Sequence, residues 1–230
     1  MSRKFFVILL ILALVAAVWM VLRKKNHNNH EEDITKQIVS VDSVDELWYK
    51  SAIIYTLDVE VFKDSDADGV GDFKGLISRL GYVDSLGVDA IWLAPFQPTP
   101  NHDDGYDVMD YYQVDQRLGS LEDFDSFVRK AKSLGIKVLM DLVVNHTSDQ
   151  HPWFRAARTD TTSSYHSWYV WSNERPPNYD KGMVFPGVQK TIWTLDTVSR
   201  KYYYHRFYSS QPDLNTQNPA VLSENRKSVV

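Results

Sequence analysis

The sequence contains no cysteine among its 230 residues. This absence excludes disulfide bonds, cysteine-based zinc sites and a lipoprotein-type acylated cysteine. It also lacks a basic stripe, with 25 Lys and Arg against 30 Asp and Glu and a net charge of −5. No nucleic-acid partner is therefore expected, because such proteins neutralise phosphates with clustered cations. The 43% hydrophobic and 24% charged residues are typical of a globular chain of one or two domains.

The N-terminus carries one long apolar run, residues 5–22, with the sequence FFVILLILALVAAVWMVL. As a helix it would be about 27 Å long, which is enough to cross the hydrocarbon core of a bilayer. Basic residues flank it on both sides. We expect residues 1–25 to be a transmembrane anchor; a cleaved signal segment and a buried helix are the alternatives. Residues 26–47 are polar and are expected to form a linker, with the following domain outside the cytoplasm: membrane-anchored (periplasmic or cell-surface) or secreted.

Hydrophobic patterning from residue 48 onward predicts alternating strands and helices. Strands are expected at 52–62, 88–96 and 136–145, the last as an apolar run buried on both faces, and helices at 73–87 and 120–135. The second helix opens with Ser120 and Asp123 in a capping-box pattern. This order implies parallel strands joined by right-handed crossovers, so residues 48–146 would form three βα units of an α/β fold. A doubly wound sheet and a (β/α)₈ barrel both fit such a start.

Polar residues follow the predicted strands. Asp103, Asp104 and Asp107 follow the second strand, and Asn145 and His146 end the third. Active-site residues of barrels lie at these carboxyl ends, and no glycine-rich phosphate loop follows the first strand. Both observations favour the barrel. Residues 146–215 show no clean periodicity and are rich in aromatic residues, so we expect a long excursion from the end of the third strand.

The loop at 64–72, DSDADGVGD, alternates acidic and small residues. The first positions resemble those of an EF-hand loop, but Gly75 stands where the bidentate glutamate would be and a strand is predicted where a helix should precede. Four aspartates this close repel one another without a cation, and hard oxygen ligands suit Ca²⁺. The loop therefore predicts a structural Ca²⁺ site; a solvated acidic turn is the alternative. The predicted ligands are Asp64, Asp66, Asp68, the Val70 carbonyl and Asp72.

Four stretches together resemble the α-amylase superfamily of retaining glycoside hydrolases, in its trehalose synthase and α-glucosidase (oligo-1,6-glucosidase) branch. They are YTLDVEVFKDSDADGVGDFKGL, GVDAIWLAPFQPTPNHDDGYDVMDYYQVDQRLGS, IKVLMDLVVNHTSDQHPWF and QPDLN. The resemblance implies a TIM barrel with a subdomain inserted after strand three. The insert would cover residues 147–215 and leave residues 216–230 as a tail.

The resemblance also implies a sugar pocket. Asp103 would accept hydrogen bonds from the hydroxyls of a glucose ring, and Tyr106 would offer an aromatic face to it. His146 and Gln211 would be further substrate contacts, and Asp141 would support the site from the third strand. Single aromatic residues of the insert could stack on sugars, but most are expected to form its core: Trp153, Phe154, Trp168, Tyr169 and Trp171.

Two metal sites are implied as well. The loop Asp64–Asp72 matches the family's structural calcium site, away from the chemistry. Asn145 and Asp213 resemble ligands of a second cation that ties the inserted subdomain to the barrel. The NHT sequence at 145–147 also fits a glycosylation sequon, but a strand-end asparagine beside a ligand is a poor acceptor.

The family's reacting carboxylates have no counterpart in these 230 residues. A retaining mechanism needs a nucleophile and an acid about 5 Å apart, and the family places them after strands four and five. We therefore expect a truncated, inactive fragment of an enzyme acting on α-glucosidic bonds of maltose, trehalose or maltooligosaccharides. The alternative is a non-catalytic membrane subunit, such as the heavy chain of an amino-acid transporter. Such a chain attaches through a cysteine, which is absent here.

Overall fold

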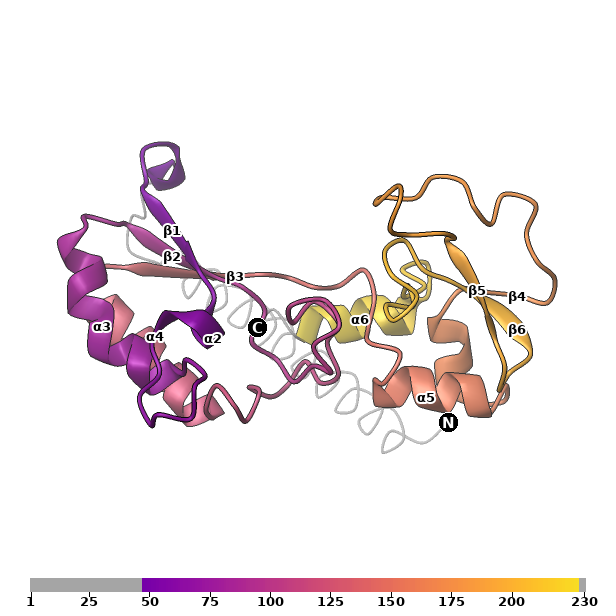
Figure 1. Ribbon diagram of the computed structural model, residues 1–230, viewed down its shortest axis with the longest axis horizontal. Coiled ribbons are helices and arrows are strands. Elements are labelled where there is room, and N and C mark those ends of the chain that lie inside the picture. The colour runs from indigo at the N-terminus through magenta and orange to yellow at the C-terminus, as the bar shows by residue number, and fades with distance from the viewer. Residues whose placement is uncertain (1–46, 228–230) are drawn as a thin grey trace, which may run out of the picture. The chain divides into compact units, whose positions relative to one another are not determined.

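The computed structural model describes residues 47–227 (Figure 1). The chain divides into two compact units, Met1–Ser51 and Ala52–Val230. The described part of the first unit holds the 3-10 helix η1 (Trp48–Lys50). Among the described residues, no helix has both the length and the apolar character needed to cross a membrane. The predicted anchor at 5–22 and most of the linker lie outside the described residues, so both remain predictions.

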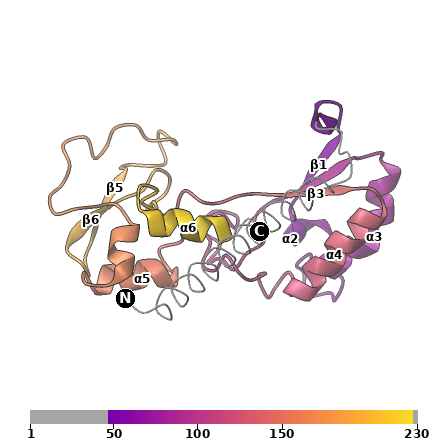
Figure 2. The ribbon, with the colours of Figure 1, turned by 180° about the vertical axis from the view of Figure 1, so that it is seen from behind.

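The second unit begins with a three-stranded parallel sheet. Its strands are β1 (Ile54–Leu57), β2 (Ala90–Leu93) and β3 (Lys137–Met140), in the spatial order β1-β2-β3. Helices α3 (Phe73–Ser85) and α4 (Leu121–Ser133) provide the crossovers. Both views show them side by side on the same face of the sheet (Figures 1 and 2). The predicted parallel arrangement is confirmed, and the consecutive strand order is the one that a barrel requires.

The core of this part lies between the sheet and the two helices. Apolar side chains recur on α3 at helical spacing and are fully buried, as Leu76, Leu80 and Val83 illustrate. On the sheet, alternate residues point toward them, such as Ile91 and Leu93. Four phenylalanines fill the space between the helices and the loop after β2; they are Phe73, Phe96, Phe124 and Phe127. Their rings meet edge-on or stacked, and such contacts favour particular ring orientations in addition to burying apolar surface.

The predicted helix boundaries are confirmed by their caps. Ser120 and Asp123 form the expected reciprocal capping box at the start of α4. After α3 and α4, Gly87 and Gly135 have φ angles of +76° and +78°. Glycine occupies this left-handed conformation without steric cost, which is why both helices end there.

Two predictions about the strands were wrong. The predicted strand 52–62 ends at Leu57, and its second half forms the short helix α2 (Val59–Phe62), because Asp58 caps the backbone NH of Glu60. The third strand ends at Met140 and does not extend to Asn145, and it is not buried on both faces, since Met140 is 43% exposed. Among the described residues β3 pairs only with β2 and is an edge strand, so part of its apolar surface is uncovered.

The segment after β3 contains regular elements that the sequence patterning did not indicate. They are α5 (Pro152–Thr159), η2 (Ser164–Trp168), β4 (Trp171–Ser172), β5 (Trp193–Asp196), β6 (Lys201–Tyr204) and α6 (Pro219–Lys227). The three strands form an antiparallel sheet in the order β4-β6-β5. Its core contains Phe154 and Tyr169, with Trp153, Trp168 and Trp171 packed against or within it. The prediction that most of these aromatic residues form the core of the inserted segment is therefore confirmed. Helix α6 lies within the residues assigned to a tail, and its Val221 is buried.

Helix α5 begins at a buried histidine, His151, whose protonation should make the stability of the chain depend on pH. The His151 Nδ1 accepts a hydrogen bond from the Trp153 backbone NH at 3.1 Å, and burial lowers the pKa of His151 to about 4. Because the unfolded chain holds this proton more tightly, the free energy of unfolding should fall as the pH drops from 6.5 to 4, by about 3 kcal/mol. His151→Asn keeps a capping oxygen but cannot be protonated, so it should remove the contribution of His151 to the pH dependence.

Urea unfolding at several pH values measures the effect. The matched control is His102→Asn, because the His102 side chain is exposed. An unchanged pH slope in His151→Asn would contradict the assignment of the histidine as the acid-sensitive cap.

Helix α3 contains two glycines with opposite surroundings. A Cβ on Gly75 would overlap the backbone carbonyl oxygen of Lys63, whereas nothing lies within 4 Å of a Cβ on Gly81. Gly75→Ala should therefore lower the free energy of unfolding by about 1–3 kcal/mol through overpacking. Gly81→Ala should raise it by up to about 1 kcal/mol, because alanine is the better helix former. Urea unfolding followed by tryptophan fluorescence measures the free energy of unfolding of both variants. If both substitutions changed it in the same direction, the close approach of Gly75 to Lys63 would be contradicted.

Candidate functional site

The loop after β2 is organised by one buried carboxylate. Asp107 is fully buried and accepts hydrogen bonds from Thr99 Oγ1 at 2.8 Å, the His102 backbone NH at 3.0 Å and the Asp103 backbone NH at 3.2 Å. The loop also has left-handed residues, with φ angles of +59° at Asn101, +45° at Asp104 and +88° at Gly105. Hydrogen bonds to Asp107 stabilise this turn and fix the backbone that carries the Asp103 side chain.

Tyr106, in the same loop, is held by Asp141, the residue that follows β3. Its hydroxyl donates to Asp141 Oδ2 at 2.6 Å, and the Trp92 indole Nε1 donates to Asp141 Oδ1 at 2.7 Å. The hydrogen bond to Asp141 raises the pKa of Tyr106 to about 12, so the hydroxyl stays protonated and donates. The Tyr106 side chain is 39% exposed. Asp141 therefore fixes the Tyr106 hydroxyl, and its role in supporting a sugar site remains a prediction.

His146 contacts the same tyrosine through its backbone. Its Nε2 lies 3.1 Å from the Tyr106 carbonyl oxygen, which can only accept, so Nε2 carries the proton. Its Nδ1 then accepts from the Asn145 side-chain amide at 3.2 Å. Burial lowers the pKa of His146 against the opposing effect of the hydrogen bond to Tyr106 and the charges of Asp103 and Asp107. The imidazole is therefore neutral near pH 7, and both of its nitrogens are engaged.

Gln211 joins the two parts of the site. It is fully buried, its Nε2 donates to Asp103 Oδ2 at 2.8 Å, and its Oε1 accepts from the Tyr208 backbone NH at 3.2 Å. In this conformation Gln211 holds the carboxylate of Asp103 and has no solvent-exposed surface for a ligand. Its predicted role as a substrate contact remains a prediction.

The QPDLN segment reaches this position by pairing with the chain after β3. His146 and Asp213 form an antiparallel bridge, and the Leu214 backbone NH donates to the Asn145 carbonyl at 2.8 Å. The pairing places the predicted second-cation ligands Asn145 and Asp213 side by side, with a hydrogen bond between their side chains. Burial raises the pKa of Asp213 to about 6. The Asn145 amide nitrogen faces His146 and Asp213, and a second cation held by Asn145 and Asp213 remains a prediction.

An aromatic neighbour of His146 was missed in the sequence. The Phe207 ring lies edge-on to the imidazole, with 5.3 Å between ring centroids, and Phe185 lies 6.2 Å from Phe207. Phe185 also stacks on Tyr208 at 5.2 Å. No periodicity marks these residues, and the only available signal was the closeness of Phe207 and Tyr208 to the QPDLN motif.

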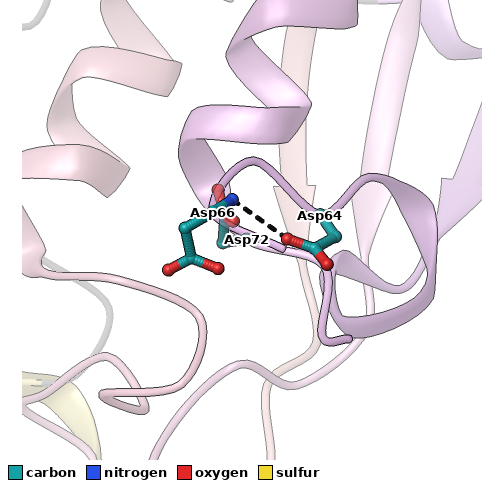
Figure 3. Close-up of side chains that lie close together, drawn as sticks. All are labelled: Asp64, Asp66 and Asp72. Carbon is teal, nitrogen blue, oxygen red and sulfur yellow. Dashed lines mark hydrogen bonds between the residues drawn. The ribbon is translucent and has the colours of Figure 1, made fainter. Parts of the chain in front are cut away.

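The acidic loop connects α2 to α3, and three of its carboxylates converge. Ligand oxygens of Asp64, Asp66 and Asp72 lie within 4.8 Å of one another (Figure 3). This group could bind a metal ion. Asp68 is not part of the group; its Oδ1 accepts from the Val70 backbone NH at 2.8 Å.

The three carboxylates differ in their own hydrogen bonds. Asp64 accepts from the backbone NH groups of Gly69, Ala67 and Asp66, and these bonds lower its pKa. Asp72 also caps α3 at Gly75. Burial raises the pKa of Asp72, but its hydrogen bonds to backbone and hydroxyl donors outweigh burial and the net pKa is lowered. The net pKa shifts of Asp64 and Asp72 favour charged carboxylates, which is the state that binds a cation.

Three parallel strands in consecutive order, with polar side chains in the segments that follow them, fit the first part of a barrel-type α/β domain. Comparison with known proteins specifies the family. Residues 54–230 match the family model Alpha-amylase, described as "Alpha amylase, catalytic domain". Trehalose synthase/amylase TreS of Mycobacterium tuberculosis (strain ATCC 25618 / H37Rv) is 45% identical over 177 residues, which are 77% of this chain and 30% of TreS. Oligo-1,6-glucosidase of Parageobacillus thermoglucosidasius is 40% identical over 185 residues, 79% of this chain and 32% of the enzyme.

A solved structure supports the same assignment. Trehalulose synthase MutB from Pseudomonas mesoacidophila MX-45 superposes with a TM-score of 0.73 at 38% identity, covering 79% of this chain and 33% of MutB. The chain therefore belongs to the α-amylase catalytic-domain family, in the branch of trehalose synthase and oligo-1,6-glucosidase, and its sheet is the N-terminal portion of the family's TIM barrel. It spans about a third of the length of these relatives.

Proposed function

We propose that this chain forms one wall of the sugar pocket of an enzyme that cleaves or rearranges α-glucosidic bonds with retention, in disaccharides such as maltose or trehalose or in maltooligosaccharides. A relative, MutB, has been crystallised in complex with its substrate sucrose. The observation that carries the proposal is the convergence of Asp103, Tyr106 and His146, which lie in the segments that follow β2 and β3, with Gln211 behind them. Carboxyl ends are where barrel enzymes bind their substrates.

Each side chain offers a different interaction to a sugar. Asp103 uses one oxygen for Gln211, so its remaining lone pairs can accept hydrogen bonds from two hydroxyls. Tyr106 is locked through its hydroxyl and keeps part of its ring exposed for apolar contact. His146 could donate to a hydroxyl only by exchanging its bond with the Tyr106 carbonyl. Phe207, beside the imidazole, adds an apolar surface.

The chemistry of bond cleavage requires further groups. Retention needs a nucleophilic carboxylate and an acid on opposite sides of the bond. The residues that match the family motifs here supply binding and orientation, so the purified 230-residue chain is expected to bind sugar without turnover.

Asp103→Asn tests the pocket. The substitution keeps the shape of the side chain but removes the charge that strengthens its hydrogen bonds to sugar hydroxyls, and such bonds contribute about 1.5–3 kcal/mol. Binding of maltose to the purified chain, measured by calorimetry or saturation-transfer NMR, should weaken about 10- to 100-fold.

The matched control is Asp104→Asn, because Asp104 is the exposed neighbour and asparagine tolerates its left-handed backbone. This control should bind maltose as the unmodified chain does. Equal affinities in Asp103→Asn and the unmodified chain, or release of glucose by either, would refute this assignment of roles.

For the acidic loop we propose a structural Ca²⁺. The three converging carboxylates provide hard oxygen ligands, and the loop is tied at both ends, since the Gly71 and Asp72 backbone NH groups donate to the carbonyls of Glu60 and Lys63. A bound ion would therefore link α2 to the first turn of α3.

Asp66→Asn is the sharpest test of this ion. Asp66 accepts a hydrogen bond of 3.3 Å from the Asp68 backbone NH, whereas Asp64 and Asp72 each hold several donors that shape the loop. Ca²⁺ should raise the melting temperature of the EDTA-treated chain, and Asp66→Asn should lose this shift. Asp84→Asn, at an exposed position on α3, is the control, and Asp68→Asn decides whether the fourth aspartate is a ligand. A chain without any Ca²⁺-dependent shift would exclude the ion.

A further inference from the structure

Gln189 is a buried polar residue in a long irregular segment. Residues 173–192 connect β4 to β5 without forming a helix or a ladder strand, and much of the segment is exposed. The Gln189 side chain, by contrast, lies inside, and the residue is 6% exposed. A buried amide is costly unless its hydrogen-bonding groups are satisfied.

All of its hydrogen-bonding groups are satisfied by backbone. The Oε1 atom accepts from the backbone NH groups of Val184 at 3.0 Å and Phe185 at 3.4 Å. The Nε2 atom donates to the carbonyls of Thr191 at 3.1 Å, Arg206 at 3.2 Å and Phe207 at 2.6 Å. The orientation of the amide is unambiguous because three carbonyl oxygens can face only the NH₂ end. One side chain thus ties the irregular segment to the chain that follows β6.

Two of the five backbone groups held by Gln189 belong to aromatic residues, Phe185 and Phe207. Phe207 lies edge-on to His146, and Phe185 lies against Phe207 and stacks on Tyr208. The Phe207 carbonyl has a second donor, His205 Nδ1, at 3.0 Å. The Phe185 carbonyl accepts from the backbone NH groups of Val188 at 3.2 Å and Gln189 at 2.9 Å, so Gln189 holds Phe185 through its backbone as well as its side chain.

We propose that Gln189 is a positioning residue of the sugar pocket, which sets the distance of the Phe185 and Phe207 rings from His146 through their backbone. The expected effect on sugar binding rests on the proposed function. The placement of the two rings by Gln189 does not. A glutamine is required because one end must accept from NH groups while the other donates to carbonyls. A carboxylate or a thioether of the same length cannot do both.

Two substitutions and one control test the proposal in the purified full chain. Gln189→Glu places an oxygen against three carbonyl oxygens, and Gln189→Met removes all five bonds with little change in shape. Gln217→Glu makes the same chemical change on an exposed glutamine. The first readout is the nuclear Overhauser effect between the ring protons of Phe207 and His146, which a purely global loss of stability in a folded chain would not change. The second readout is the affinity for maltose.

Both Gln189 variants should lose the ring contact and bind maltose at least tenfold more weakly, whereas Gln217→Glu should change neither. Retention of the contact and of the affinity in both variants overturns the proposal. A wild-type chain that shows the contact but does not bind maltose contradicts the proposed function instead, and the ring contact alone then decides the role of Gln189.

Hydrogen exchange in the unmodified chain covers the case in which neither variant folds. The side-chain NH₂ of Gln189 should exchange much more slowly than that of the exposed Gln217. Equal exchange rates would overturn the proposal without recourse to any variant.

Discussion

The antiparallel pairing of residues 145–149 with residues 210–214 is the interaction on which the rest of the site depends. It comprises the bridge between His146 and Asp213 and backbone hydrogen bonds from Thr147, Asp149 and Leu214. The pairing closes a long excursion of the chain back onto the end of β3. Because the entropy cost of closing a loop grows only slowly with its length, a few bonds and a shared aromatic core can hold it. Without this pairing, Gln211 would not reach Asp103.

Buried polar side chains then carry the geometry from the regular elements into the loops. Asp107 collects three donors in the loop after β2, Gln211 fixes the Asp103 carboxylate, and Gln189 gathers five backbone groups around the aromatic residues. Each is nearly or fully buried and fully hydrogen-bonded. Apolar packing would tolerate several loop conformations, whereas a satisfied buried amide or carboxylate permits few, because any shift leaves a costly unpaired group. Irregular segments can therefore hold side chains at defined positions.

The sequence predicted the elements whose signals are local. The periodicity of α3 and α4, the capping box at Ser120 and the glycines that end both helices each lie within a few residues of the feature they specify. The short helix α2 was missed because its apolar residues, Val59 and Phe62 among them, are strand formers, and the capping by Asp58 decided the conformation instead. The antiparallel sheet and the roles of Gln189 and Phe207 were missed for another reason. Strand β4 pairs with β6 across the long irregular segment, Gln189 reaches forward to Arg206 and Phe207, and the Phe207 ring lies against His146. No local pattern specifies these contacts.

The charges around the pocket favour one kind of ligand. Asp103, Asp107 and Asp141 surround His146 and Tyr106, and the partners described for these carboxylates are neutral: amide and backbone NH groups, hydroxyls and an indole. The imidazole adds no positive charge, because burial lowers its pKa. An anion such as a phosphate ester would be repelled by this arrangement. A neutral polyol would instead donate its hydroxyls to Asp103 and lay an apolar ring face against Tyr106. The carboxylates and the neutral imidazole of this site thus fit the proposed sugar ligand better than an anion.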